Sequence, residues 1–176
     1  VLKALEYNLK PLCITWRTPA RTFLGQENLD NLVKLGVDHI DFTINPEIEK
    51  KFTLETLKKM GSVAIPMHFA IYSVPLKFAT QFNIPLVIYG ENSALEYGGD
   101  SGFGSIITKE WLLKYGVTQG TTIEDWISKK LKSEDLDMYR YPTDEVLRES
   151  GVKAVFLGNY FNWDPNQTHE IAKSVG

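Results

Sequence analysis

Residues 86–99 have the sequence "LVIYGENSALEYGG", which predicts both a fold class and the place of a site. Four apolar residues at the start of this stretch are followed directly by glycine, acids and an amide. A short apolar run without polar alternation is typical of a strand that is covered on both faces in a parallel sheet. In such sheets, ligands bind beyond the carboxyl ends of the strands. The stretch therefore predicts a buried strand over 86–89 that ends at a ligand site.

Further apolar runs, separated by helical patterns, extend this prediction along the chain. The other predicted strands cover 12–16, 39–44 and 152–157. The predicted helices cover 1–9, 27–35, 45–60, 67–82, 108–115, 122–131, 143–149 and 165–175, and 136–142 is expected to be an aromatic loop. The alternation of strands and helices predicts an α/β fold, with one parallel sheet and helices on both of its faces.

The chain begins with a helical pattern that no strand precedes. In a doubly wound sheet, such a helix connects one parallel strand to the next. We therefore expect a first strand before Val1, followed by the loop where these folds bind phosphate. On this view residues 1–99 form a nucleotide-binding core that is incomplete at its N-terminus. Residues 100–176 form the mostly helical remainder of the same domain, with one further strand.

Composition and charge argue against several classes of protein. A length of 176 residues suits one domain, and a net charge of -3 does not suggest a nucleic-acid surface. No apolar stretch reaches the roughly 18 residues of a membrane span, and residues 1–10 do not resemble a signal peptide. Cys13 is the single cysteine, so the chain has no internal disulfide or Cys-rich zinc site. We expect a cytoplasmic protein with no nucleic-acid or membrane partner, in which Cys13 is a core residue rather than a nucleophile.

The residues at the ends of the predicted strands are the candidates for chemistry. They are Thr15, Trp16 and Arg17; Asn45; Gly90, Glu91 and Asn92; and Gly158, Asn159 and Tyr160. Several of the candidate residues also have a structural interpretation: Glu91 suits a helix start, Asn45 and Asp164 suit helix caps, and Gly98-Gly99 suits a turn. His39 fits the end of a strand and His68 a helix core. Because G-x-S-x-G, G-x-G-x-x-G and Walker motifs are absent, the residues alone indicate only a nucleotide-sized site on an α/β sheet.

A resemblance to a known family makes this prediction of a nucleotide-sized site more specific. In chain order, "LCITWRTP", "GQENLDNLVKLGVDHIDFTINP", "IPMHFAIYSVPLKFATQFNIPLVIYGENSALEYGG", "WLLKYG", "YRYP" and "FLGNYFNWDP" resemble the N-acetyl sugar amidotransferases. These are PP-loop ATP pyrophosphatases of lipopolysaccharide O-antigen, pseudaminic-acid and flagellin sugar pathways. The resemblance runs from about Pro11 to Gly176, and G-E-N-S-A-x-E-Y-G-G is its most specific part. The family's S-G-G-x-D-S loop and its Cys pairs are not in this chain, which agrees with the expected missing strand.

The resemblance implies a fold, a reaction and a set of site residues. The implied fold is that of the adenine nucleotide alpha hydrolases. The implied reaction converts an N-acetyl group of a sugar or nucleotide sugar into an acetamidino group. It uses ATP, Mg²⁺ and ammonia, which a glutaminase partner supplies. Thr15, Trp16, Gly90, Glu91 and Asn92 would bind the nucleotide. Glu91 and Glu96 would be catalytic, either by sharing a magnesium ion with ATP or by accepting a proton from ammonia. Tyr97, Gly98, Gly99 and Asp164 would face the sugar. No residue is assigned as a dedicated metal ligand. Without the PP-loop, residues 1–176 alone are expected to be inactive.

Two alternatives stay open. One is another PP-loop enzyme, such as a tRNA thiolase or a relative of the NAD or GMP synthetases. A thiolase needs a basic RNA-binding surface and catalytic cysteines, against which the net charge of -3 and the lone Cys13 argue. The other is a non-catalytic nucleotide-binding module. The identity of the sugar, that of the glutaminase and the oligomeric state, including a homo-oligomer, also stay open.

Overall fold

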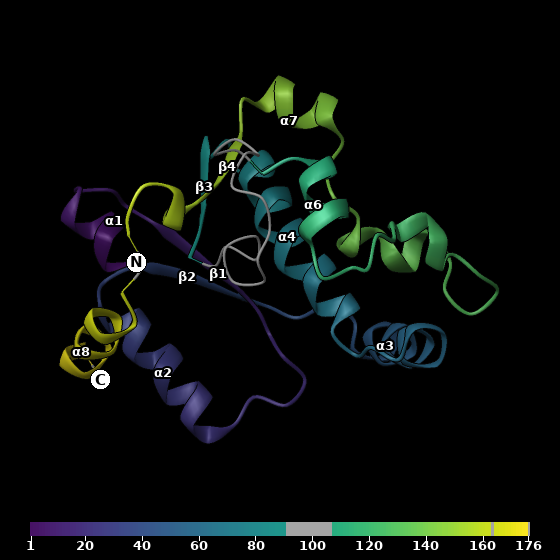
Figure 1. The fold of residues 1–176 in the computed structure, drawn as a ribbon, viewed down its shortest axis with the longest axis horizontal. Helices are drawn as coiled ribbons and strands as arrows, with labels where there is room; N and C mark the ends of the chain where they lie inside the picture. Colours follow the sequence, from purple (N-terminus) through teal and green to yellow (C-terminus); the bar gives the residue numbers. More distant parts are fainter. Residues whose placement is uncertain (91–106, 163, 176) are drawn as a thin grey trace. The chain divides into compact units, whose positions relative to one another are not determined.

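The computed structural model describes residues 1–90, 107–162 and 164–175, which form helices and short parallel strands (Figure 1). The chain divides into two compact units. The first comprises Val1–Ile44 with Trp163–Gly176, and the second comprises Asn45–Asn162. The boundary expected at residue 99 lies outside the described residues. Each unit is therefore considered by itself.

The first unit contains a parallel strand pair and its crossover helix. Its elements are α1 (Leu2–Glu6), β1 (Leu12–Trp16), α2 (Phe23–Lys34), β2 (Asp38–Phe42) and α8 (Pro165–Val175). β1 and β2 pair in parallel, with Leu12 opposite Asp38 and Trp16 opposite Phe42. The Thr22 hydroxyl accepts a hydrogen bond from the Gly25 amide at 3.1 Å, so α2 begins four residues before the predicted start.

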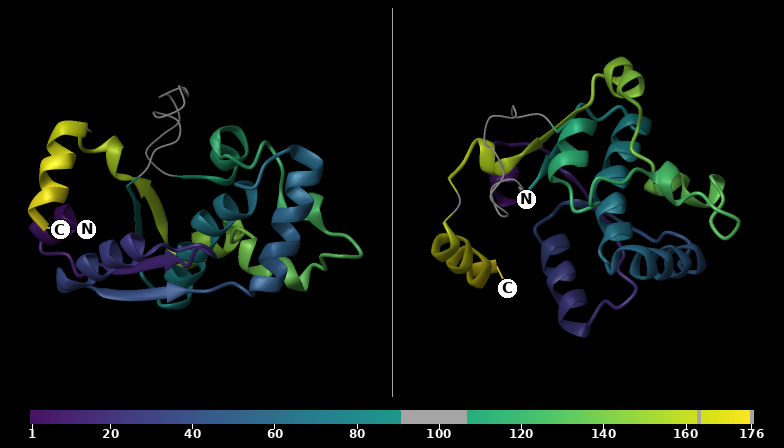
Figure 2. Two further views of the ribbon diagram at one scale, coloured as in Figure 1. Left: turned by 90° about the horizontal axis from the view of Figure 1, so that it is seen from below. Right: turned by 45° about the vertical axis from the view of Figure 1, so that its right-hand side comes forward.

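The second unit contains the longer helices and a second parallel strand pair. Its elements are α3 (Pro46–Met60), α4 (Ile65–Gln81), β3 (Leu86–Tyr89), α6 (Lys109–Tyr115), the 3₁₀ segments η1 (Ile123–Trp126) and η2 (Glu134–Tyr139), α7 (Asp144–Ser150), β4 (Lys153–Phe156) and the 3₁₀ turn η3 (Leu157–Asn159). The views of Figures 1 and 2 show α3 against one end of α4. α4 continues through Pro75 and is buried on several sides. It is the central helix of this unit.

Two groups of side chains form the core of the second unit. One joins α4 and α6 to β4, and its closest ring pair is Trp111 and Phe156, with centroids 4.7 Å apart. The other is an aromatic cluster around Phe52 of α3, which lies against Phe69, Trp126 and Tyr139. This second cluster joins α3 and α4 to both 3₁₀ segments. Buried aromatic rings in such edge-on and stacked contacts contribute strongly to the stability of a core.

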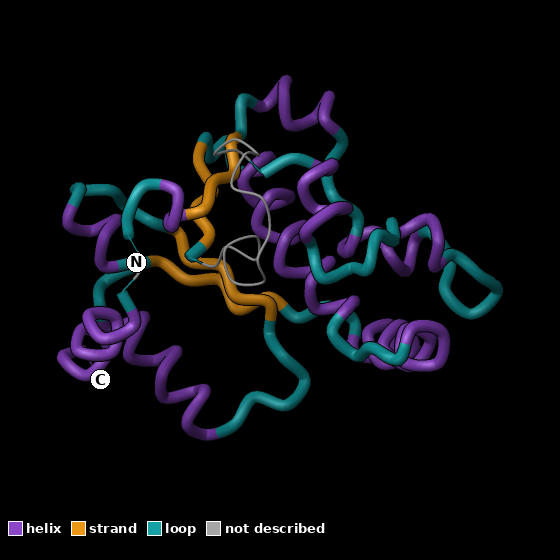
Figure 3. The backbone as a smooth tube through the Cα atoms, viewed as in Figure 1, coloured by secondary structure: helices purple, strands orange, loops and turns teal. Residues whose placement is uncertain are grey.

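Parallel pairing of the predicted strands is confirmed, but a single four-stranded sheet is not what the described residues form. β1 pairs with β2, and β3 pairs with β4, as two separate two-stranded sheets (Figure 3). Apolar runs identify strands, but each strand has two edges. The composition of a strand does not determine which edge will hydrogen-bond to which neighbour.

Two further predictions in the second unit are wrong. An α-helix was predicted over 122–131, but η1 ends at Trp126 and the backbone is extended at Ile127. The aromatic loop predicted over 136–142 contains most of η2. In both segments the buried side chains are three residues apart, Ile123 with Trp126 and Leu136 with Tyr139. That spacing places them on one side of a 3₁₀ helix, which has three residues per turn.

Gly116 ends α6 at a position where no larger residue fits. Its amide donates to the Leu112 carbonyl oxygen at 2.8 Å, and a Cβ atom here would lie 2.2 Å from that oxygen. We expect Gly116→Ala to lower the free energy of unfolding by about 1–3 kcal/mol, because the helix end must shift to relieve the overlap. Urea unfolding measures this change.

Gly25→Ala is the matched control, since its Cβ would meet nothing closer than 3.4 Å within α2. It should raise the free energy of unfolding by about 0.5–1 kcal/mol, because alanine is favoured over glycine in a helix. A Gly116→Ala protein as stable as the parent would contradict the steric argument.

Candidate functional site

One face of the β1–β2 pair carries an unusual set of polar and reactive side chains. In the parallel register Cys13 lies opposite His39, and Thr15 lies opposite Asp41. Alternate residues of a strand point to the same face, so these four side chains share one face. The opposite face carries Ile14, Trp16, Ile40 and Phe42. Strands of parallel sheets are usually apolar on both faces, so this polar face is the candidate functional site of the first unit.

Hydrogen bonds and ion pairs connect this face to the loop that follows β1. The Thr15 Oγ1 atom lies 2.9 Å from His39 Nε2. Arg21 donates two hydrogen bonds to Asp41, from Nη1 at 2.7 Å and from Nη2 at 2.6 Å. Arg17 Nη1 lies 3.7 Å from the same carboxylate. Asp41 therefore holds two arginines of one loop at the carboxyl end of β1.

The charges of this cluster favour an anionic ligand. The hydrogen bonds from Arg21 lower the pKa of Asp41, so the carboxylate is ionised at neutral pH. Two guanidinium groups and one carboxylate leave a net charge of +1. The Arg21 side chain is only 12% exposed, whereas that of Arg17 is 55% exposed. Arg17 is thus accessible to a phosphate or carboxylate, whose oxygens match the planar guanidinium.

The thiol of Cys13 is half-buried on the same face. Burial raises its pKa, so it is a neutral thiol at physiological pH. Because the thiolate is the nucleophilic form, Cys13 is poorly suited to nucleophilic catalysis. This supports its interpretation as a packing residue and argues against a cysteine-dependent thiolase.

The residues predicted to form the site are only partly within the described chain. Thr15 and Trp16 end β1, and the Trp16 Nε1 atom is buried without a hydrogen-bond partner among residues 1–90, 107–162 and 164–175. Gly90 follows β3 in the second unit and is exposed. Asp164 accepts hydrogen bonds from the Asn166 and Gln167 amides at 2.8 and 3.2 Å, and so caps α8. Glu91, Asn92, Glu96, Tyr97, Gly98 and Gly99 lie outside the described residues, and their roles stay predictions.

Sequence reasoning missed His39, Asp41 and Arg21 as members of the site. The segment 38–42, "DHIDF", did contain a signal, because His39 and Asp41 are two residues apart and share a face. The pairing with Arg21 had no comparable signal. It depends on the path of the 17–22 loop, which the sequence pattern does not define.

The described residues contain neither a metal-binding cluster nor a membrane-spanning helix. Within the described part of the chain, no group of three or more His, Cys, Asp or Glu side chains is placed to hold a metal ion. None of the described helices is both long and apolar enough to cross a membrane. A scan against models of known protein families and a comparison with curated proteins both find no match to this chain.

Removing the charge of Asp41 should destabilise the protein in a pH-dependent way. We expect Asp41→Asn to lower the free energy of unfolding at pH 7 by about 2 kcal/mol, because Arg21 loses its charged acceptor. Asp41 has a lowered pKa in the folded state. Ionised Asp41 therefore makes its whole contribution to the free energy of unfolding above the ordinary Asp pKa of about 3.9. That contribution is lost as the pH falls through the pKa of Asp41 in the folded state.

Urea unfolding at several pH values tests this prediction. Asp38→Asn, on the same strand but exposed, is the control and should change stability little at any pH. The difference between wild type and Asp41→Asn should disappear in strong acid. A difference that stays constant down to that pH would show that the ion pairs are not its cause.

Proposed function

We propose that the chain belongs to an ATP-dependent amidotransferase that converts the N-acetyl group of a sugar into an acetamidino group. The observation that carries the proposal is the cationic cluster of Arg17 and Arg21 around Asp41 at the carboxyl end of a parallel strand. This is the end where α/β nucleotide-binding proteins hold their ligands. The resemblance of residues 90–99 and five other segments to the N-acetyl sugar amidotransferases supports the choice of reaction.

The reaction has two steps. The amide oxygen of the N-acetyl group attacks the α-phosphorus of ATP, and pyrophosphate leaves. Ammonia then adds to the activated carbon and gives up one proton, and AMP leaves with the former amide oxygen. Activation is needed because an amide oxygen is a poor leaving group. Exclusion of water protects the activated sugar from hydrolysis.

The proposal gives the residues of the chain separate tasks. Thr15 and Trp16 end β1. In the proposal these two residues lie beside the adenine, and Arg17 pairs with a phosphate of the nucleotide. Glu91 or Glu96 takes the proton from ammonia, and Tyr97, Gly98, Gly99 and Asp164 lie toward the sugar. Mg²⁺ bound with ATP would neutralise phosphate charge. A separate glutaminase supplies ammonia, and the reaction takes place in the cytoplasm.

The fate of the amide oxygen tests this function. The product of the complete gene would be incubated with ATP, Mg²⁺, ammonium chloride and N-acetyl sugars labelled with ¹⁸O in the acetyl carbonyl, both free and nucleotide-linked. Ammonium chloride removes the need for a glutaminase. We expect pyrophosphate, ¹⁸O-labelled AMP and a sugar in which NH has replaced oxygen. The same sugars without an N-acetyl group are the control. Formation of ADP and phosphate, or of unlabelled AMP, would contradict the proposal.

A further inference from the structure

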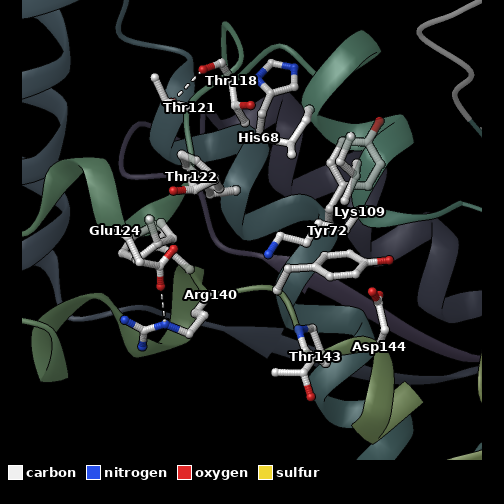
Figure 4. Close-up of a pocket in the computed structure, with 17 residues that line it drawn as sticks. His68, Tyr72, Lys109, Thr118, Thr121, Thr122, Glu124, Arg140, Thr143 and Asp144 are labelled. Atoms are coloured by element: carbon white, nitrogen blue, oxygen red, sulfur yellow. Dashed lines mark hydrogen bonds and ion pairs between the residues drawn. The ribbon is translucent and has the colours of Figure 1, made fainter. Parts of the chain in front are cut away.

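The second unit contains a cavity of about 270 Å³ that the proposed nucleotide site does not use (Figure 4). It is bounded by the first half of α4, by α6, by residues 118–124 and by residues 139–144. Sites for drug-sized ligands typically measure roughly 300–1,000 Å³. The cavity is therefore suited to a small molecule rather than to a nucleotide.

Much of the cavity wall is apolar and open to a ligand. Phe69 contributes an aromatic ring from α4, Leu112 and Leu113 contribute aliphatic side chains from α6, and Pro142 lies in the segment before α7. All four residues are partly exposed, so a molecule in the cavity can contact them. Covering apolar surface is favourable by about 25 cal/mol for each Å² removed from water. The wall therefore favours a ligand with an apolar group.

Two exposed side chains of opposite charge also line the cavity. Lys109 is the first residue of α6, and Asp144 is the first residue of α7. Within residues 1–90, 107–162 and 164–175, neither forms an ion pair with the other or with a third residue. In the view of Figure 4, Lys109 extends between Asp144 and the ion pair of Glu124 with Arg140. Both charges are therefore available to a ligand.

The place of Lys109 is unfavourable for α6 itself. The N-terminus of a helix carries a partial positive charge, so carboxylates are favoured there and cations are not. The helix start is already capped by Thr108, whose hydroxyl accepts from the Trp111 amide at 3.2 Å. Asp144, by contrast, has a favourable place at the start of α7. The stability of α6 therefore does not explain Lys109, whereas an anionic group in the cavity would.

The charges of the cavity match a ligand that carries both signs. Arg140 is occupied, because it pairs with Glu124 at 3.1 Å and donates to Asp137 at 3.2 Å. One cation and one carboxylate remain, those of Lys109 and Asp144. A ligand with only a negative charge would be repelled by Asp144, and one with only a positive charge would be repelled by Lys109. A free α-amino acid carries an ammonium group and a carboxylate at neutral pH and so suits both residues.

We propose that this cavity binds a free α-amino acid with an apolar side chain of the size of leucine or phenylalanine. Its carboxylate pairs with Lys109, its ammonium group pairs with Asp144, and its side chain lies against Phe69, Leu112 and Leu113. The site binds the amino acid without a chemical step. It shares no residue with those assigned to amidotransfer and requires neither ATP nor a sugar.

Amide chemical shifts of the ¹⁵N-labelled chain measure this binding. L-Leucine and L-phenylalanine would each be titrated beside two analogues. Isocaproate and hydrocinnamate lack the ammonium group, whereas isoamylamine and phenethylamine lack the carboxylate. L-Glutamine keeps both charges but has a polar side chain.

We expect saturable shifts at Lys109, Leu113 and Thr122 with at least one of the two apolar amino acids. Its analogues and L-glutamine should bind at least about tenfold more weakly, because each lacks a charged contact or the apolar one. Absence of saturation by both apolar amino acids would overturn the proposal. An analogue or L-glutamine with an affinity within tenfold of the better amino acid would do the same.

Lys109→Gln and Asp144→Asn test the two charged contacts separately. Each should weaken binding of the amino acid about tenfold. Lys109→Gln should not weaken binding of the amine analogue, which has no carboxylate, and Asp144→Asn should not weaken binding of the analogue without an ammonium group. Lys114→Gln on α6 and Glu145→Gln on α7 are the matched controls and should leave every affinity unchanged.

The pattern across ligands distinguishes a contact from a structural effect. All four substituted positions are exposed, so the melting temperature should stay nearly constant. Unchanged amino-acid affinity in Lys109→Gln or in Asp144→Asn would overturn the proposal. Equal weakening of the amino acid and of the analogue that lacks the matching charge would also overturn it, because the substitution would then act through the fold.

Discussion

Replacing Phe52 with alanine is expected to lower the free energy of unfolding by about 3–5 kcal/mol. The Phe52 side chain is fully buried, with 0% exposed. Its ring centroid lies 5.1 Å from that of Tyr139 and 5.6 Å from that of Trp126, both in edge-on geometry, and 6.1 Å from that of Phe69. Alanine would leave a cavity among rings from α4, η1 and η2. The loss therefore combines buried area, ring contacts and an unfilled space.

Urea unfolding followed by circular dichroism measures this loss. Leu54→Ala is the control, since Leu54 lies on the same helix but is 46% exposed. It should change the free energy of unfolding by no more than about 0.5 kcal/mol. If the two variants lost equal stability, the aromatic cluster would not be the centre of the core of this unit.

Replacing Glu49 with glutamine should stabilise the protein above neutral pH and leave it unchanged in acid. Glu49 lies on α3 with only 6% of its surface exposed, and the described residues give it no ion pair. Burial raises its pKa from 4.5 to about 7. A difference of one pKa unit corresponds to about 1.4 kcal/mol, so ionised Glu49 costs about 3 kcal/mol. We expect Glu49→Gln to recover most of this at pH 8, about 2–3 kcal/mol.

The direction of the pH dependence follows from the raised pKa. Between about pH 4.5 and 7 the folded state holds a proton that the unfolded state has lost, so wild-type stability falls as the pH rises. Above pH 7 the cost is constant. Glu47→Gln, on the exposed side of the same helix, is the control and should show no such trend. Equal stability of Glu49→Gln and wild type at pH 8 would mean that the carboxylate is not desolvated.

Local signals in the sequence predicted much of the secondary structure. The apolar runs predicted all of the described strands to within a few residues. The predicted burial of the 86–89 strand is wrong, because Leu86 and Ile88 of β3 are 44% and 41% exposed. Asn45 and Gly61 were also reliable markers of the ends of α3. The Asn45 side chain accepts from the Glu47 amide, and Gly61 adopts a left-handed conformation with φ of 66°.

Features that depend on distant residues were not predicted. Arg21 and Asp41 are 20 positions apart, and their pairing requires the loop after β1 to turn back onto β2. The cavity of the second unit is formed by segments from His68 to Asp144, none of which has a motif of its own. The 3₁₀ geometry of η1 and η2 depends on what Trp126 and Tyr139 pack against. Such contacts are properties of the tertiary structure, so periodicity along one segment does not contain them.

The half-buried thiol of Cys13 provides a chemical reporter of local opening. Its raised pKa and its place on β1 predict slow alkylation by iodoacetamide until β1 separates from β2. Trp111 and Trp126 are buried in the other unit, whereas Trp16 and Trp163 belong to the same unit as Cys13. In a variant with Trp16 and Trp163 replaced by phenylalanine, tryptophan fluorescence therefore reports on the other unit. Comparing alkylation with fluorescence along one urea titration would show whether the two units unfold cooperatively. Alkylation that accelerates before the fluorescence changes would identify the β1–β2 unit as an independently opening foldon.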